Sequence, residues 1–293
     1  MKSKKILVTC PPMIKLIDNF YNYAQSIGLE LFPVEVKQTL SEDQLMSLLP
    51  IYDGWIIGDD PATYKVLKSG KSGNLKAAVK WGVGTDNLDF EAFKKLEIKI
   101  SNTPGMFGAE VSDIAIGYLI ALARDTFWID REIRKGNWPK PSGISLSNKV
   151  CGVVGYGNIG INTCKRLKAL DMKIIIYDPN ISKIDLQDNL EIAEWPNKLE
   201  ELDFIIINCS LNKSTYHLLD NDAFDKMKNG IRLINVGRGP VVDEEALTLA
   251  IQNKKVHSAA LDVFENEPLP LESKLRNFKH CIFGSHNSSN TID

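Results

Sequence analysis

The stretch of sequence that decides the fold lies in the middle of the chain and reads Val153-Val154-Gly155-Tyr156-Gly157-Asn158-Ile159-Gly160. It follows an apolar segment, residues 149–154, that predicts a β-strand, and it opens a helical segment, residues 158–170. In such a loop the first glycine makes a tight turn, the second lets the backbone approach a pyrophosphate, and the third lets the helix pack on the strand. The helix N-terminus then presents unpaired N–H groups to the phosphates. The stretch therefore predicts a dinucleotide-binding βαβ unit.

The residue after the next strand indicates which dinucleotide is bound. Residues 173–177 predict that strand, and Asp178 follows it, eighteen positions after Gly160. A carboxylate there accepts hydrogen bonds from the adenosine ribose hydroxyls and repels a 2′-phosphate, and no arginine occurs among residues 179–182. The sequence therefore predicts NAD rather than NADP. A turn-forming Asp before Pro179 is the alternative interpretation, and it is compatible with the same role.

Length and composition indicate a two-domain globular protein. The chain has 293 residues, of which 25% are charged and 44% hydrophobic, and a net charge of -2. That balance favours neither nucleic acid nor an anionic membrane, and no apolar stretch has the length of a membrane span. The N-terminus enters a short strand without the apolar region of a signal peptide, and the five cysteines lack C-x-x-C spacing. We expect a cytoplasmic protein with reduced thiols and, because no His/Cys pair has ligand spacing, no metal.

The first hundred residues alternate strand and helix patterns, which predicts a parallel sheet with right-handed crossovers. The predicted strands are residues 6–9, 29–36, 55–57, 77–81 and 98–101, and the predicted helices are residues 13–27, 42–49, 64–68 and 90–96. A break follows at residues 102–105, which contain Pro104 and Gly105.

The second part of the chain begins with a predicted long helix, residues 110–124, and a segment expected to be irregular, residues 131–147. The alternation then resumes, with later strands expected at residues 204–208, 232–235, 258–261 and 281–283 and helices at residues 222–228 and 244–252. Together with the two strands around the glycine loop they predict a six-stranded doubly wound sheet. The cofactor domain is accordingly assigned to residues 104–286, and the substrate domain to residues 1–103 plus 287–293.

With these segments placed, the chain resembles the D-isomer-specific 2-hydroxyacid dehydrogenase family, in particular its phosphoglycerate dehydrogenase-like members. The matching segments are residues 155–160, 235–247, 260–268 and 285–286, and residues 82–87 match the substrate loop of that family. The resemblance covers nearly the whole chain. It implies an α/β fold of two lobes, a flavodoxin-like substrate lobe into which a Rossmann NAD-binding lobe is inserted, and this accounts for the mid-chain position of the glycine loop.

Three side chains suit the chemistry that the resemblance implies. Reduction of a 2-keto acid needs a cation for the carboxylate and carbonyl, a proton donor and a hydride. Arg238 offers a charged bidentate fork, His286 can donate and accept a proton, and Glu267 beside it would stabilise the imidazolium. By resemblance these three form the catalytic set. The backbone N–H groups of Val83 and Gly84 would bind the substrate carboxylate together with Arg238.

Each of the three also has an ordinary interpretation when it is taken alone: a surface ion pair for Arg238, a loop acid for Glu267 and a turn residue for His286. The functional interpretation rests on their joint occurrence at matching positions after the glycine loop. The other histidines lack partner motifs and are expected to be structural or solvated; they are His217, His257 and His280.

The resemblance also implies a set of NAD contacts at the glycine loop and at the ends of the following strands. They are Gly155, Tyr156, Gly157, Asn158, Ile159, Gly160, Asp178, Cys209, Ser210, Val236, Gly237, Arg238, Asp262 and His286. Asp262 resembles the residue near the nicotinamide carboxamide, whereas Ser210 stands where the family usually has proline.

Several departures from the family pattern bear on the substrate. Asp59 and Asp60 occupy a region where many phosphoglycerate enzymes place an arginine, and they would disfavour a phosphorylated substrate if they face it. Formate-oxidising relatives carry glutamine in place of Glu267, so formate is not expected. Family members continue past the position of Asp293 with a helix that crosses back to the first lobe; the chain is either naturally short or lacks that part, whose loss would expose apolar surface.

These observations predict an NAD-dependent D-2-hydroxyacid dehydrogenase for a phosphoglycerate-, glyoxylate- or hydroxypyruvate-type substrate. Two alternatives stay open: an NAD(H)-sensing, non-catalytic protein of the same fold, and an enzyme inactivated by a short C-terminus. The resemblance further implies a homodimer that pairs cofactor domains through the helix at residues 110–124 and an arm at residues 128–138; alternatively, the aromatic residues there cap a core. The identity of the 2-hydroxy acid cannot be read from the sequence.

Overall fold

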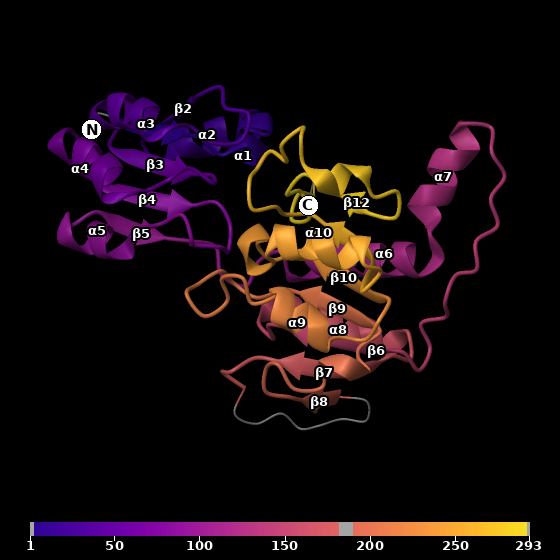
Figure 1. The fold of residues 1–293 in the computed structure, drawn as a ribbon. Helices are drawn as coiled ribbons and strands as arrows, with labels where there is room; N and C mark the ends of the chain where they lie inside the picture. The colour runs from indigo at the N-terminus through magenta and orange to yellow at the C-terminus, as the bar shows by residue number, and fades with distance from the viewer. Residues whose placement is uncertain (1–2, 182–189, 292–293) are drawn as a thin grey trace. The chain divides into compact units, whose positions relative to one another are not determined.

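The computed structural model describes residues 3–181 and 190–291, and the chain divides into two compact units, Met1–Met106 and Phe107–Asp293 (Figure 1). The division lies three residues after the boundary expected from the Pro104-Gly105 break. Residues 287–291 lie with the second unit, whereas the sequence assigned them to the substrate domain. Backbone N–H groups of Asn287 and Ser288 bind the Asp262 carboxylate, which holds this segment to the second sheet.

The first unit is a parallel five-stranded sheet in the order β2-β1-β3-β4-β5, the flavodoxin-like arrangement. Its strands are β1 (Lys4–Val8), β2 (Leu29–Pro33), β3 (Gly54–Ile57), β4 (Ala77–Lys80) and β5 (Lys99–Ser101). Its helices are α1 (Pro11–Lys15), α2 (Asp18–Ser26), α3 (Glu42–Leu48), α4 (Tyr64–Ser72) and α5 (Phe90–Lys95), with a 3₁₀ turn at Leu49–Ile51. The predicted fold class is confirmed for this unit.

Apolar side chains cover both faces of the first sheet. Leu7, Trp55 and Ile57 pack with buried residues of α3, α4 and α5, while Val8 and Leu31 pack on the other face with α1 and α2. Burial on both faces explains the apolar run of the central strand β3, Gly54–Ile57, in which only Ile56 is not fully buried.

The second unit is a parallel seven-stranded sheet in the order β12-β11-β10-β9-β6-β7-β8, which contains the Rossmann arrangement. Its strands are β6 (Val150–Val154), β7 (Lys173–Tyr177), β8 (Leu190–Ile192), β9 (Phe204–Ile207), β10 (Ile231–Asn235), β11 (Val256–Leu261) and β12 (Ile282–Phe283). Its helices are α6 (Gly108–Arg124), α7 (Thr126–Arg134), α8 (Asn158–Ala169), α9 (Asn221–Lys226) and α10 (Glu244–Gln252), with 3₁₀ turns at Leu199–Glu201, Gly239–Val241 and Lys274–Asn277.

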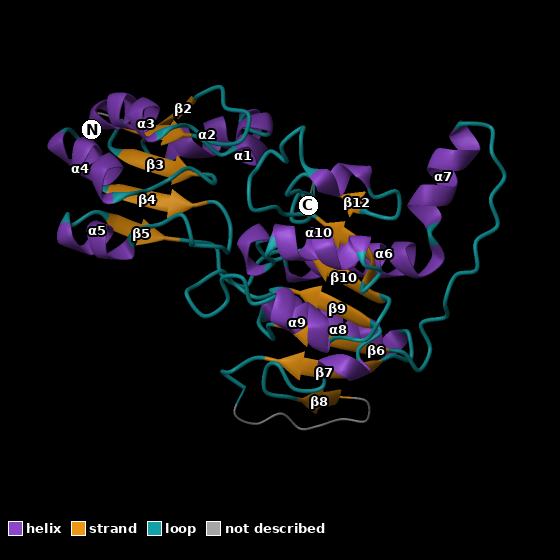
Figure 2. Cartoon of the chain, viewed as in Figure 1, coloured by secondary structure: helices purple, strands orange, loops and turns teal. Residues whose placement is uncertain are grey.

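Helices cover the second sheet on both faces, as Figure 2 shows. Along β9, Phe204 and Ile206 pack with α6 and α8, and the alternate residues Ile205 and Ile207 pack with α9 and α10. All four are fully buried. The glycine loop thus lies at the end of a central strand, between two helical layers.

Three expectations about the elements were wrong. The sheet has seven strands rather than six. The strand that the sequence did not predict is β8, which is only three residues long and carries little apolar pattern. The helix expected at residues 13–27 is divided into α1 and α2, where Leu16 and Ile17 make tighter i→i−3 hydrogen bonds. Helix α7 extends to Arg134, into the segment expected to be irregular.

Other expectations are confirmed residue by residue. Helix α10 begins and ends where predicted, and Asp243 caps it by accepting the N–H groups of Glu245 and Ala246. Within the described ranges, no helix combines the length and the apolar character that crossing a membrane requires.

Two leucines of α10 provide a matched test of the core. Leu247 is fully buried, and Leu249, on the same helix, is 45% exposed. We expect Leu247→Ala to lower the free energy of unfolding by about 2–5 kcal/mol, because it removes buried methyl groups and leaves a cavity. Leu249→Ala should change it by less than about 0.5 kcal/mol. Urea denaturation measures both, and equal losses would contradict this packing.

Candidate functional site

The glycine loop has the geometry that its three glycines predict. Gly155 has φ +90°, and a side chain there would lie 2.7 Å from the Cys209 backbone. Gly157 has no heavy atom within 4 Å of the position that a Cβ would occupy. A Cβ on Gly160 would overlap the Gly155 carbonyl oxygen, so the missing side chain lets α8 pack tightly against the loop.

The start of α8 is suited to an anion. Helix α8 has twelve residues, begins directly after Gly157, and has neither a side-chain cap nor an acidic residue in its first turn. Its first N–H groups and the positive end of the helix dipole lie next to Gly157, where no described heavy atom is within 4 Å of the position that a Cβ would occupy. A pyrophosphate fits these requirements, because among the described residues nothing lies within 4 Å of a Cβ position on Gly157 and no carboxylate caps the first turn of α8.

Asp178 closes the other side of the glycine loop. One carboxylate oxygen accepts the Tyr156 N–H at 2.8 Å, and the other accepts the Asn180 N–H at 2.8 Å. Both bonds fix the carboxylate at the end of β7, next to the loop. A fixed negative charge at this position disfavours a 2′-phosphorylated ribose.

The end of β9 completes the rim of the loop. Cys209 is half-buried beside Gly155, and burial raises the pKa of its thiol to about 11. Ser210 is exposed, and its carbonyl accepts the Thr215 hydroxyl at 2.8 Å. Both polar side-chain atoms of Asn208 are buried and have no hydrogen-bond partner among the described residues.

Arg238 lies on a loop that a buried asparagine organises. Asn235 is 1% exposed; its Oδ1 accepts the Gly237 N–H at 3.0 Å, and its Nδ2 donates to the Arg238 carbonyl at 3.0 Å. The Arg238 Nη1 donates to the Gly237 carbonyl at 2.9 Å. A side chain on Gly239 would overlap the Phe264 backbone, so the loop fits tightly against the segment that leads to Glu267. Asn235 is therefore a positioning residue. It belongs to the matching segment 235–247, but the sequence alone indicated no role for it.

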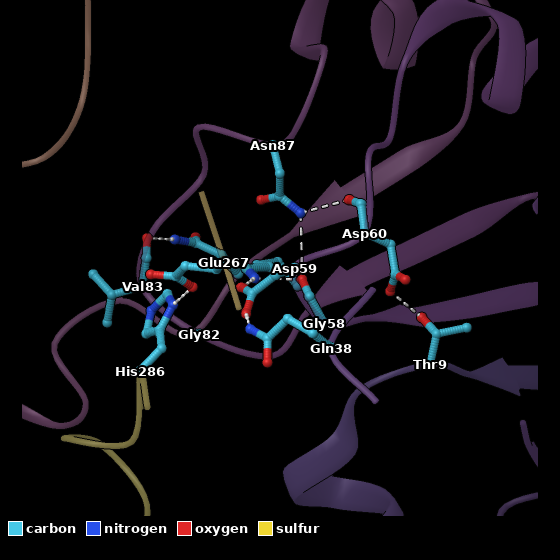
Figure 3. A network of polar contacts seen from close by, with 12 residues as sticks. Thr9, Gln38, Gly58, Asp59, Asp60, Gly82, Val83, Asn87, Glu267 and His286 are labelled. Carbon is cyan, nitrogen blue, oxygen red and sulfur yellow. Dashed lines mark hydrogen bonds and ion pairs between the residues drawn. The ribbon is translucent and has the colours of Figure 1, made fainter. Parts of the chain in front are cut away.

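Glu267 and His286 form a hydrogen-bonded pair, visible in Figure 3. The His286 Nδ1 lies 2.8 Å from the Glu267 Oε2, and the Glu267 Oε1 accepts the Phe264 N–H at 2.9 Å. The backbone N–H of His286 donates to the backbone carbonyl of Asp262 at 2.7 Å. Both ends of the pair are thus anchored to backbone, and the imidazole Nε2 is the ring nitrogen turned away from the carboxylate.

Asp262 supports this loop rather than standing free to meet a ligand. It is 3% exposed and accepts the N–H groups of Asn287 and Ser288 at 3.2 and 3.0 Å and the Ser288 hydroxyl at 2.5 Å. Burial, and secondarily the Asp262 charge, raises the pKa of the nearby Tyr118 to about 12. A side chain on Gly284 would overlap the Asp262 carboxylate, so close packing fixes the strand that precedes His286.

In the first unit, Val83 and Gly84 lie in the turn after β4. Figure 3 shows Val83 in this turn, next to Gly82. The Asn102 amide donates to the Val83 carbonyl at 3.0 Å, and the Gly82 N–H donates to the Thr103 hydroxyl at 3.2 Å. These two bonds join the turn to the segment after β5 and fix its backbone.

The two neighbouring carboxylates, Asp59 and Asp60, do not behave alike. The Asp60 side chain is fully buried, accepts the Leu40 N–H at 2.8 Å and lies 2.5 Å from the Thr9 hydroxyl oxygen. Burial raises the pKa of Asp60. The Asp59 side chain is 39% exposed. Only one of the two carboxylates is therefore available to oppose an anionic ligand.

Two of the other histidines have acidic partners. His217 bonds Glu265 at 2.9 Å, and His280 bonds Asp125 at 3.1 Å. With Asp243, His217 and Glu265 form a group spaced closely enough for a metal. His217 already bonds Glu265 directly and stacks on Tyr216, so a structural role explains the group.

The family model for the NAD-binding domain of D-isomer specific 2-hydroxyacid dehydrogenases matches residues 116–288. Hydroxypyruvate reductase of Thermotoga maritima is 34% identical over 259 residues, which is 87% of this chain and 83% of that protein. D-3-phosphoglycerate dehydrogenase of Archaeoglobus fulgidus is 33% identical over 98% of this chain, which spans only 54% of the length of that relative. A crystal structure of a glyoxylate reductase from Paecilomyes thermophila has a TM-score of 0.85 at 26% identity and covers 100% of this chain and 90% of its own.

The chain belongs to the D-isomer specific 2-hydroxyacid dehydrogenase family, and its cofactor is NAD. The predicted family, fold class and cofactor are confirmed. The structure brings together Glu267 with His286, Asn235 with Arg238, and the glycine loop with Asp178 and Cys209. Val83 and Gly84 belong to the first unit and the other predicted site residues to the second.

Gly157 and Gly160 offer a matched test of the cofactor loop. Because the space beside Gly157 is open, Gly157→Ala should keep the wild-type Tm but weaken NADH binding at least about tenfold, since its methyl group obstructs the phosphates. Gly160→Ala should instead lower stability by about 1–3 kcal/mol through overlap with Gly155. Fluorescence titration and thermal melts measure the two effects. Unchanged NADH affinity in Gly157→Ala would show that the phosphates do not approach there.

Proposed function

We propose that this protein is an NAD-dependent D-2-hydroxyacid dehydrogenase that interconverts a 2-keto acid and a D-2-hydroxy acid. The observation that carries the proposal is the 2.8 Å hydrogen bond between Glu267 and His286. The two side chains are 21% and 24% exposed, so the imidazole is accessible while its position is fixed. A histidine oriented by a carboxylate is a recurring arrangement for proton transfer near neutral pH.

His286 is assigned the proton transfer. Its Nδ1 side is held by Glu267, so Nε2 is the atom that gives a proton to the substrate oxygen during reduction and accepts it during oxidation. The Glu267 carboxylate stabilises the protonated imidazole through a charge-assisted hydrogen bond. The Phe264 N–H, bound to the other carboxylate oxygen, keeps Glu267 in this orientation.

The remaining chemistry needs a binding site for the carboxylate and a hydride donor. We assign the substrate carboxylate to the Arg238 guanidinium and to the N–H groups of Val83 and Gly84, a fork and a pair of donors suited to two oxygens. When bound, NADH supplies the hydride that adds to C2 of the keto acid. The hydride and the proton from His286 together convert the carbonyl to a hydroxyl group. Asn235 holds the Arg238 backbone and so sets the origin of the guanidinium.

The names of the similar proteins narrow the substrate class. They are a hydroxypyruvate reductase, a glyoxylate reductase and D-3-phosphoglycerate dehydrogenases. The proposed substrates are therefore 2-keto acids of the size of glyoxylate and hydroxypyruvate, or the corresponding hydroxy acids. The proposed division of labour gives substrate binding to residues 1–103 and NAD binding to residues 104–286. Residues 287–291, which the sequence grouped with the substrate domain, lie with the second unit.

We also propose a cytoplasmic homodimer that pairs through the NAD-binding domains. Support comes from apolar side chains on α7 and just after it: Phe127 is 47%, Ile133 is 40% and Trp138 is 78% exposed in the single chain. Exposed aromatic side chains concentrated in one segment are typical of an interface.

The proton-transfer role is tested by His286→Ala, with His280→Ala as the matched control because His280 also pairs with a carboxylate. We expect His286→Ala to lower kcat at least about 10²-fold, since no group replaces the proton donor, while NADH affinity stays within a factor of a few. His280→Ala should retain turnover. Steady-state assays with NADH, glyoxylate and hydroxypyruvate measure this.

Two outcomes would contradict the proposal. Equal kcat in His286→Ala and wild type would remove His286 from the reaction. Tight NADH binding by the wild type without turnover of any 2-keto acid would indicate an NAD(H)-sensing protein instead.

A further inference from the structure

An ion pair between a buried lysine and a partly exposed aspartate joins the ends of two neighbouring strands in the first unit. Lys80 is the last residue of β4, and Asp59 lies two residues after β3. The Lys80 Nζ is 2.8 Å from the Asp59 Oδ1 and also donates to the Gly58 carbonyl. The Lys80 side chain is only 3% exposed, whereas that of Asp59 is 39% exposed. A ligand approaching from solvent therefore meets the anion of the pair and not the cation.

The turn that carries Asp59 is fixed on both sides, as Figure 3 shows. Gln38 donates to the second Asp59 oxygen at 3.2 Å. The Asn87 amide donates to the carbonyls of Gly58 at 3.3 Å and Asp60 at 2.7 Å. A side chain on Gly58 would lie 3.1 Å from the Cys10 Cα, so the strand ends approach closely and the turn has little room to move. Asp59 is thus held over Lys80.

The pair lies where this kind of sheet binds ligands. In open parallel sheets, ligands lie outside the carboxyl ends of the strands, near the point where the strand order reverses. In the first unit the order reverses between β1 and β3, and Asp59 follows β3. Lys80 leads directly into the turn containing Val83 and Gly84, and a Cβ on Gly82 would be 3.5 Å from the Lys80 Cε.

We propose that Asp59 masks Lys80 and thereby selects 2-keto acids whose side chain is uncharged over those that carry a phosphate. This inference rests on the proposed function, because it concerns the substrate side chain next to the carboxylate-binding turn. An unmasked lysine there would attract a phosphate. With Asp59 in place the two charges largely cancel, and the exposed carboxylate repels an anion. Releasing Lys80 to a phosphate would separate the buried Lys80 ammonium from Asp59, which costs free energy because the ammonium is shielded from water.

The direct test compares hydroxypyruvate with its phosphate ester as substrates of the complete protein with NADH. The wild type should prefer hydroxypyruvate in kcat/KM at least about tenfold. Asp59→Asn keeps a hydrogen-bond acceptor for Lys80 but removes the charge, so it should reduce this preference at least about tenfold, mainly by improving use of the ester. Adding Lys80→Met to Asp59→Asn should abolish the gain. Glu35→Gln, which removes an exposed carboxylate from the same unit, is the charge control and should leave the preference unchanged.

A wild-type preference for the ester, an unchanged preference in Asp59→Asn, or a gain that persists without Lys80 would each overturn the inference. Thermal melts establish that the variants fold. If Asp59→Asn does not fold, Lys80→Met alone tests the same idea, because it removes the Lys80 cation next to Asp59 and should therefore widen the wild-type discrimination against the ester.

A binding measurement separates this inference from the proposed function. Calorimetric titration with 3-phosphoglycerate needs no turnover. If no variant reduces any keto acid, the proposed function fails, yet a Lys80-dependent gain in 3-phosphoglycerate affinity of at least about tenfold in Asp59→Asn would still support masking. Equal affinities in the wild type and Asp59→Asn would refute it.

Discussion

The direction of the strands is the constraint on which the candidate site depends. Each described strand pair in both units is parallel, so the carboxyl ends of the strands in a sheet emerge at one edge. The glycine loop follows β6, Asp178 follows β7, the Arg238 loop follows β10, and His286 follows β12. Residues that are far apart in the sequence thus share an edge because helical crossovers return each strand in the same direction. The chemistry is carried by loops, and their spacing is set by the sheet.

Buried polar side chains hold those loops in place. Asn235 bonds two backbone groups around Arg238, and Asp262 bonds the backbone on the far side of His286. An unpaired buried carboxylate or amide is costly, so each of these residues favours the one loop conformation that satisfies it. The catalytic candidates can then remain partly exposed. The loops that carry them are held in position by Asn235 and Asp262, which a substrate does not need to touch. This is the usual way in which a protein preorganises a reactive group.

The sequence was sufficient for features that depend on local pattern. The glycine loop, the boundaries of α10 and β7, and the parallel two-unit architecture follow from apolar periodicity and glycine spacing. The sequence was insufficient where residues far away along the chain determine which contacts a side chain makes. Asp59 and Asp60 are adjacent and chemically identical, yet Asp60 turns inward to Thr9 and Leu40 while Asp59 reaches Lys80, a difference set by residues some twenty or more positions away. Strand β8 was not predicted, because a short strand at the edge of a sheet needs only a neighbouring strand to pair with and not a long apolar run.

The position of Cys209 has a consequence for reactivity. Its backbone lies against Gly155 in the candidate cofactor loop, and burial raises the pKa of its thiol to about 11. At pH 7 the thiol is then protonated, and the thiolate is the form that attacks electrophiles and peroxides. The side chain beside the dinucleotide loop therefore behaves as a small apolar group. We therefore expect this thiol to react slowly with alkylating agents and mild oxidants, although the cysteine borders the glycine loop.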